Sequence, residues 1–149
     1  MQSKIGTPSL TLEHLPFRDA EGYVLPMIQA NSLEIMDRPA NPDLITMRCM
    51  CEAGMLRVYV LFKDQEPIGY CLMAISNNLL WQDIKQAVQL VVYVKPEHRG
   101  RAGAWMIAEV DKDLRQFVDR IYRHSRDARV GLFRKFGYKI DEATYLLET

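Results

Sequence analysis

The sequence has few cysteines, no excess of either charge and no long apolar run. Its 149 residues include three cysteines, Cys49, Cys51 and Cys71. An odd number at this spacing provides neither a disulfide framework nor a CxxC pair, so we expect reduced thiols, a cytoplasmic location and no metal site. The longest apolar runs, at about six residues, are far too short for a membrane span, and the first ten residues lack the apolar core of a signal peptide.

The charge balance also narrows the set of partners. Lys and Arg together number 19, as do Asp and Glu, so the formal net charge is zero. This balance argues against a nucleic-acid partner, because proteins that bind nucleic-acid phosphates usually carry a basic excess. The alternative is a local basic patch built from Arg115, Arg120, Arg123, Arg126 and Arg129. Acidic residues close by in the sequence weaken that alternative.

Length and hydrophobic patterning predict a single α/β domain with a mixed sheet. A chain of this size can bury roughly 70% of its unfolded surface without a disulfide or metal, and no repeat or linker divides it. Alternating apolar residues at 56–62, a turn at 63–66 and a returning strand predict a hairpin. The strands are expected at 9–15, 56–62, 67–75, 87–94, 118–124 and 140–147, and the helices at 19–36, 41–55, 101–117 and 126–136.

Local signals suggest where these elements begin and end. Asp19 is a candidate cap for the first helix, and Pro26 should lie near its first turn or kink it. Asn41 followed by Pro42 is typical of a helix start, and it predicts the beginning of the second helix. Gly137 is placed to end the last helix.

The run RGRAGA, residues 99–104, lies where the apolar strand at 87–94 gives way to an amphipathic helix. The first amides of a helix lack partners within the helix and carry about half a positive charge, so anions bind there readily. The two arginines of the run suit phosphate oxygens, and its two glycines let the backbone approach a ligand. The run predicts a site for a phosphate-bearing cofactor, with a solvated surface turn as the alternative.

Further along, residues 132–138 read LFRKFGY. Together with VKPEH before the run, these segments resemble the GNAT acyltransferase superfamily, whose signature is Q/R-x-x-G-x-G/A after a strand and L-Y-x-K-x-G-F near the C-terminus. The resemblance covers roughly residues 56–147 and is nearest to small stand-alone members, such as those that phages encode. It implies one GNAT-like domain over 1–149, with a mainly antiparallel sheet and helices on both faces.

The resemblance also implies an N-acetyltransferase that uses acetyl-coenzyme A and no metal. The acetyl group would pass directly to a primary amine of a small molecule or protein, in a ternary complex. Catalysis would depend on holding the partners together and on a backbone N–H aimed at the developing oxyanion. The diphosphate would lie on helix amides, and the pantetheine arm would pair with the central strand. The expected coenzyme A contacts are Val92, Tyr93, Val94, Arg99, Gly100, Arg101, Ala102, Gly103, Ala104 and Phe133.

Two positions depart from the family pattern. Ala102 replaces the first glycine of the signature; an alanine costs about 1–2 kcal/mol if the backbone there is left-handed, and little if it is helical. Phe133 stands where many members carry a tyrosine, the usual proton donor to the leaving thiolate. A thiol with a pKa near 8.5 can leave unaided at a cost of about 2 kcal/mol at pH 7, which a slower enzyme tolerates.

The general base and the acceptor site are less well marked. An amine with a pKa near 10.4 is neutral in only about one molecule in 10³ at pH 7, so a base would help. Some members carry a glutamate in the central strand, where this chain has Gln89. His124, at the end of the next strand, is the second candidate, or else it is simply a partly exposed histidine. Trp81 and the turn from Met36 to Pro39 are predicted to shape the acceptor site.

The same departures favour an alternative from another class. The chain would then be a GNAT-shaped protein with weak or no activity that binds a partner, for example in a viral particle or a regulatory complex. A homodimer formed through the last strand is a further open alternative.

Overall fold

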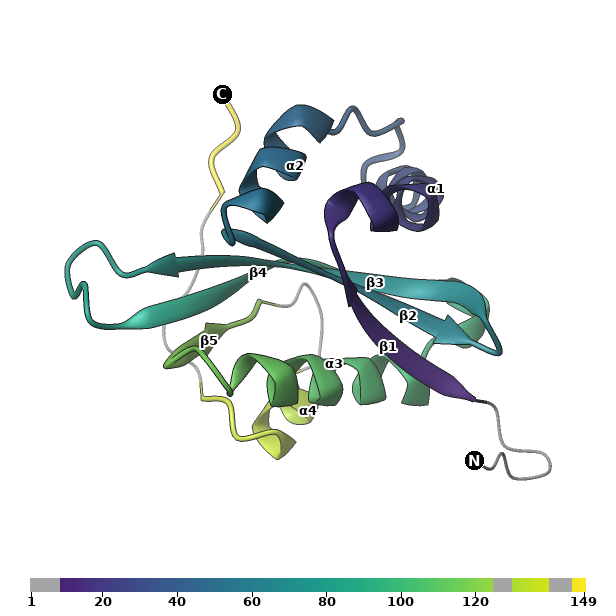
Figure 1. Cartoon of the computed structure of the whole chain (residues 1–149). Helices are drawn as coiled ribbons and strands as arrows, with labels where there is room; N and C mark the ends of the chain where they lie inside the picture. The colour runs from purple at the N-terminus through teal and green to yellow at the C-terminus, as the bar shows by residue number, and fades with distance from the viewer. Residues whose placement is uncertain (1–8, 125–129, 140–145) are drawn as a thin grey trace.

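The computed structural model describes residues 9–124, 130–139 and 146–149 (Figure 1). A five-stranded sheet in the order β1-β2-β3-β4-β5 lies between two layers of helices, with α1 and α2 on one face and α3 and α4 on the other. The strands are β1 (Leu10–Leu15), β2 (Leu56–Lys63), β3 (Glu66–Asn77), β4 (Lys85–Val94) and β5 (Arg120–Tyr122). The helices are α1 (Phe17–Met36), α2 (Leu44–Glu52), α3 (Arg101–Leu114) and α4 (Val130–Lys135), with a 3-10 turn at Pro96–His98.

Strand pairing confirms the predicted class of sheet. Each neighbouring pair is antiparallel except β4 and β5, which are parallel. A parallel pair needs a crossover connection. α3 lies between β4 and β5 in the sequence and supplies this connection. None of the helices that the structure describes is long and apolar enough to cross a membrane.

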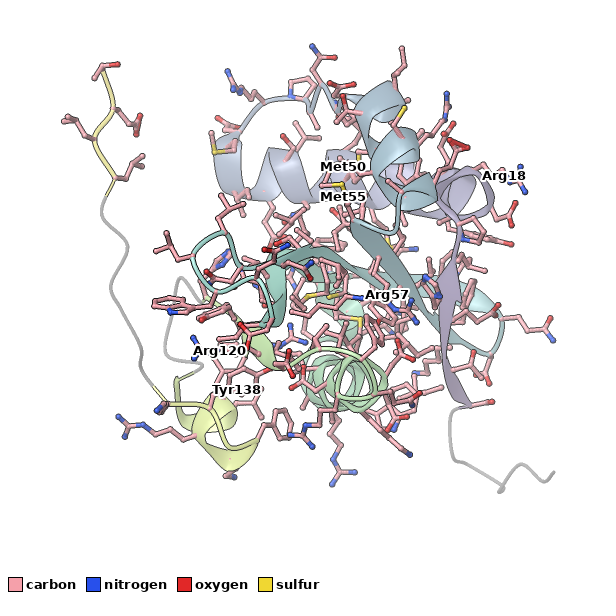
Figure 2. The ribbon with its side chains drawn as sticks, turned by 60° about the vertical axis from the view of Figure 1, so that its left-hand side comes forward. Arg18, Met50, Met55, Arg57, Arg120 and Tyr138 are labelled. Atoms are coloured by element: carbon pink, nitrogen blue, oxygen red, sulfur yellow. The ribbon has the colours of Figure 1, made fainter. Side chains whose placement is uncertain are left out.

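The alternating side chains of β2 explain why the sheet is covered on both faces. Val58 and Val60 pack under α1 and α2, whereas Tyr59 and Leu61 pack toward α3. All four are at most 1% exposed. Met50 of α2 adds to the first of these cores, as its place between the helix and the sheet shows (Figure 2). Full burial of an aliphatic side chain contributes roughly 1.5–3 kcal/mol, so the two cores fix the sheet in place.

The predicted hairpin between β2 and β3 is confirmed. Lys63 pairs with Glu66 across a connection of two residues. These residues, Asp64 and Gln65, have φ angles of 49° and 71°. Two successive left-handed residues form the turn whose twist matches that of a hairpin.

Some predicted boundaries are wrong. α1 begins at Phe17, so Asp19 lies in its first turn, and Pro26 lies inside the helix rather than near its start. α2 begins at Leu44, because Asp43 caps it by accepting a hydrogen bond from the amide of Thr46 at 3.0 Å. The predicted start at 41–42 is therefore two residues too early.

The C-terminal part differs from the prediction in length. α3 ends at Leu114, so Phe117 lies beyond it, and β5 is shorter than the predicted strand at 118–124. Gly137, with a φ of 90°, follows α4 as expected. Residues 140–145 of the predicted last strand lie outside the described residues, and residues 146–149 form no strand.

Candidate functional site

The edge of β4 is open along its second half. β4 pairs with β5 only from Gln86 to Val88, opposite Arg120 to Tyr122. Beyond Val88, β4 runs on to Val94 with no partner on that side in the described part of the chain, while its β3 side stays paired up to Val94. An unpaired strand edge can accept an extended ligand through backbone hydrogen bonds.

A bulge in β4 lies at the start of this open edge. Met73 pairs with Gln89 and Leu72 pairs with Val91, so Leu90 is an extra residue. Bulges bend a strand and disrupt regular pairing, and they are common beside active sites. Beyond the bulge, side chains alternate again, with Tyr93 in the α1 core and Val92 in the α3 core.

The N-terminus of α3 lies just past the end of this edge. Its N-cap is Gly100, which provides no side-chain cap and has φ 108° and ψ −116°. The first hydrogen bond of the helix runs from the amide of Ala104 to the carbonyl of Gly100, at 3.2 Å. The amides of Arg101, Ala102 and Gly103 precede this bond and so have no partner within the helix. These three donors fit an anion such as a diphosphate.

The backbone explains the residue types at positions 100 and 102. A φ of 108° is a conformation that residues with a side chain rarely adopt, so position 100 requires glycine. Ala102 is the second residue of α3 and has a helical backbone. The left-handed conformation that would penalise an alanine is absent at this described position, so Ala102 costs little.

Arg99, one of the predicted cofactor contacts, is already paired with α1. Its two terminal nitrogens each lie 2.6 Å from a carboxylate oxygen of Glu34, and its Nε donates to the carbonyl of Val94 at 2.8 Å. These hydrogen bonds hold the pKa of Glu34 below its ordinary value. The guanidinium also lies 5.6 Å from the ring centre of Tyr93. A cofactor contact by Arg99 would therefore compete with an existing ion pair, whereas Arg101 is exposed.

The two predicted catalytic residues, Gln89 and His124, are in contact. The contact joins the side chain of Gln89 to the backbone of His124. Gln89 is only 7% exposed, and its Nε2 donates to the carbonyl of His124 at 3.1 Å. Its Oε1 accepts from Arg123 at 3.0 Å. An amide does not take up a proton at neutral pH, and both ends of this one are occupied, so the geometry gives Gln89 a structural role. The imidazole of His124 is exposed.

A buried ionic cluster, which the sequence analysis missed, lies behind Gln89. Arg123 and Asp111 are paired at 2.7 Å with side chains 0% and 3% exposed. Tyr138, which follows α4 (Figure 2), donates to Asp111 at 2.7 Å and accepts from Arg123 at 3.0 Å. Burial raises the pKa of Tyr138, which keeps its hydroxyl protonated as a donor. Asp111 is 2% exposed, so its carboxylate lies on the buried face of α3.

The remaining predicted residues lie on separate elements. Phe133 of α4 is half-buried, with its ring 5.6 Å from that of Tyr138. Met36, at the end of α1, and Trp81, in the β3–β4 loop, are 53% and 55% exposed. Both are thus accessible to an acceptor molecule.

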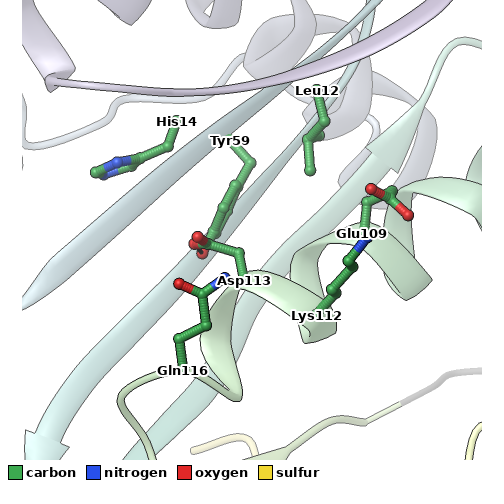
Figure 3. Close-up of a pocket in the computed structure, with 7 residues that line it drawn as sticks. All are labelled: Leu12, His14, Tyr59, Glu109, Lys112, Asp113 and Gln116. Carbon is green, nitrogen blue, oxygen red and sulfur yellow. Dashed lines mark hydrogen bonds between the residues drawn. The ribbon is translucent and has the colours of Figure 1, made fainter.

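A separate pocket of about 250 Å³ lies between β1, β2 and the second half of α3 (Figure 3). Two of its polar lining residues are already paired, because Tyr59 donates to the carboxylate of Asp113, which also accepts from Arg57. Its α3 residues begin at Glu109, two turns from the open amides. The described residues contain no group of three or more His, Cys, Asp or Glu side chains that could hold a metal. We therefore place the candidate site at the α3 N-terminus and the open β4 edge.

Comparison with known proteins assigns the family. The model of the acetyltransferase (GNAT) family matches residues 28–138. The chain belongs to this family. The predicted resemblance of the chain to the GNAT superfamily is thereby confirmed. The GNAT family transfers acetyl groups from acetyl-coenzyme A.

Solved structures show the same fold. An acetyltransferase from Trypanosoma brucei superposes with a TM-score of 0.73 at 16% identity, covering 95% of this chain and 100% of that chain. An aminoglycoside acetyltransferase from an uncultured soil metagenomic sample gives 0.71 at 15%, covering 95% and 99%. A ribosomal-protein-alanine N-acetyltransferase from Brucella melitensis gives 0.65 at 17%, covering 95% and 99%. A search of curated proteins found no match. At these identities the structural likeness shows the fold alone.

Proposed function

We propose that this GNAT protein transfers an acetyl group from acetyl-coenzyme A directly to a primary amine. One observation carries the proposal: three helix amides without internal partners lie at the end of an unpaired strand edge. A ligand with a diphosphate followed by an extended amide-containing arm matches this arrangement. Coenzyme A has that shape, and its thioester supplies the activated acetyl group.

The residues at the α3 N-terminus would hold the diphosphate. The amides of Arg101, Ala102 and Gly103 point along the helix axis, where the helix dipole adds positive potential. Gly100 gives the backbone the turn that exposes them, and the exposed Arg101 adds a charge. The backbone of Val92 and Val94 would pair with the arm.

Transfer would depend on orientation more than on acid–base groups. A neutral amine forms a bond to the acetyl carbon, the carbon–sulfur bond breaks so that coenzyme A leaves as its thiolate, and the amine nitrogen releases one proton. A fixed orientation can contribute roughly 7–11 kcal/mol to such a reaction. We assign proton acceptance to His124, which is exposed and lies two residues beyond β5, and we assign no side chain as the acid because Phe133 has no hydroxyl.

The acceptor is proposed to be an amine reached past the exposed end of α1 and the β3–β4 loop. Met36 and Trp81 offer apolar surface there. Among the structural relatives, one acetylates aminoglycosides and another acts on a ribosomal-protein alanine. Both kinds of acceptor present a primary amine, so both belong in a first test.

The test measures release of free thiol from acetyl-coenzyme A with three acceptors: an aminoglycoside, a peptide with a free N-terminal alanine, and the same peptide acetylated. We expect release above background with a primary amine and none with the acetylated peptide. Calorimetry with acetyl-coenzyme A accompanies it. No binding at millimolar concentration would overturn the proposal.

A second candidate is a GNAT-shaped binding protein with little activity. Phe133 without a hydroxyl and the occupied amide of Gln89 favour it. Binding of acetyl-coenzyme A without transfer to any amine would support this candidate over the enzyme.

A further inference from the structure

The β4–β5 ladder ends where a side chain takes the place of backbone pairing. Val88 and Tyr122 form the last pair, so Gln89 and Arg123 would be the next. Instead, Gln89 Nε2 donates to the carbonyl of His124, and Arg123 donates to Gln89 Oε1. In a continuing parallel ladder, a carbonyl at this point of β5 would accept from a backbone amide of β4. The Gln89 side chain occupies that acceptor.

Arg123 is bonded to α3 as well as to the Gln89 side chain. Its Nε and one terminal nitrogen donate to Asp111 Oδ1 at 3.2 and 2.7 Å. Tyr138 closes the cluster from the segment after α4 by donating to Asp111 Oδ2. Among the described residues, no buried side-chain nitrogen or oxygen lacks a partner. The segment after β5 is therefore fastened to α3, and it is joined to β4 through the Gln89 side chain in place of further backbone pairing.

Such a cluster is an unusual way to stabilise a fold. Well-packed apolar residues of similar volume often replace a buried ion pair without loss of stability. The cluster lies at the point where the two strands part, between the bulge at Leu90 and the end of β5. Its position suggests a role in geometry.

We propose that Gln89 and Arg123 are positioning residues that end the β4–β5 ladder and keep the β4 edge open for the pantetheine arm. This inference rests on the proposed function. Under this inference, different structural elements hold the site for the diphosphate and the site for the pantetheine arm. The amides that would bind the diphosphate lie at the start of α3, which follows β4 in the chain. The gap beside the β4 edge, in which the pantetheine arm would lie, depends on the buried cluster for its width. Loss of the cluster should weaken binding of the arm and spare binding of the diphosphate.

The test compares two ligands by calorimetry: coenzyme A, and 3′-phosphoadenosine 5′-diphosphate, which lacks the arm. Gln89→Leu removes the amide that occupies the His124 carbonyl. The matched control is Gln86→Leu, the same change on the same strand, where Gln86 bonds Asn78 and lies within the paired region. For Gln89→Leu we expect coenzyme A to bind about tenfold more weakly and the nucleotide to change by less than about twofold, because only the arm uses the strand edge. Gln86→Leu should leave both affinities unchanged.

A second variant separates a loss of affinity from a loss of folding. The double substitution Asp111→Leu and Arg123→Met replaces the buried pair with apolar groups, and circular dichroism would establish that it folds. It should show the same selective loss of coenzyme A affinity. Equal weakening of both ligands, or no weakening of coenzyme A in either variant, would overturn this inference alone. Failure of the unsubstituted protein to bind either ligand would overturn the proposed function together with it.

Discussion

The guanidinium of Arg99 forms two hydrogen bonds of 2.6 Å with the carboxylate of Glu34, joining the segment between β4 and α3 to the last turns of α1. The sequence pattern assigned Arg99 to the cofactor together with Arg101. The structure separates these two arginines, since one is paired across the fold and the other is exposed at the helix start.

Substitution of each arginine by alanine should therefore have different effects. Arg99→Ala should lower the free energy of unfolding by at most about 1 kcal/mol, because both partners of this ion pair are about two-fifths exposed and screened by water. It should leave acetyl-coenzyme A affinity nearly unchanged. Arg101→Ala should weaken that affinity by about fivefold and leave stability unchanged, as expected for an exposed phosphate contact. Urea unfolding and calorimetry measure both quantities. If Arg99→Ala weakens the cofactor as much as Arg101→Ala, Arg99 leaves Glu34 to bind phosphate.

The two glycines of the RGRAGA run should respond differently to alanine. Gly100→Ala forces a side chain into a φ of 108°, so it should lower the free energy of unfolding by about 1–2 kcal/mol and impair cofactor binding. Gly103 is the matched control, because a Cβ there would meet Val94 at 3.6 Å, an ordinary contact. Gly103→Ala should fold normally. Any loss of coenzyme A affinity in this variant would then come from a steric clash between the added methyl group and the bound ligand. Equal stability of the two variants would contradict this assignment.

The cysteines should differ in reactivity with a thiol reagent. Burial raises the pKa of Cys71 to about 11, and the side chain is 1% exposed, whereas Cys49 is exposed. Since the thiolate is the reactive form, Cys71 should not be labelled at neutral pH until the protein unfolds. Mass spectrometry after labelling with iodoacetamide, with and without urea, checks this. A Cys49→Ser variant removes the fast site, and rapid labelling of Cys71 in the folded variant would contradict the burial.

Acidification should destabilise the fold through His14. Although His14 is exposed, partial desolvation of its ring beside Tyr59, together with the charge of Arg57, lowers its pKa from the ordinary value of 6.5. The unfolded chain therefore binds a proton more readily than the folded one, and stability rises with pH in this range. The contribution of neutral His14 is complete above about pH 6.5 and is lost as the pH falls through the lower folded pKa. Urea unfolding at several pH values should show this slope, and His14→Gln should flatten it. An unchanged slope in the variant would assign the effect to other groups.

Local patterns were sufficient to predict most of the elements. The alternation of Val58 and Val60 with Tyr59 and Leu61 predicted β2 because each face of the sheet is covered by its own core. The start of α3 followed from the glycine-containing run, since Gly100 adopts a backbone that other residues rarely adopt. The cap of α2 was misplaced because Asn41 and Asp43 are both good caps, and only packing decides between them.

The arrangement of the site could not be predicted from local patterns. The bulge at Leu90 is defined by the register between β3 and β4, which no segment specifies alone. Asp111 follows the buried Ile107 by four residues, and both lie on the same face of α3. This spacing was the available signal, but a carboxylate is seldom fully buried without a partner, and Arg123 lies on a different element. Arginines near the C-terminus were considered together as a surface patch, whereas the side chain of Arg123 is fully buried.

The central claim is that the amides at the start of α3 bind the diphosphate of acetyl-coenzyme A. The most direct measurement is the nuclear magnetic resonance spectrum of the ¹⁵N-labelled protein during titration with coenzyme A. The account predicts that the amide signals of Arg101, Ala102 and Gly103 shift together and saturate at one equivalent, while those around the Tyr59–Asp113 pocket stay in place. Unchanged signals at 101–103, or shifts confined to that pocket, would contradict it.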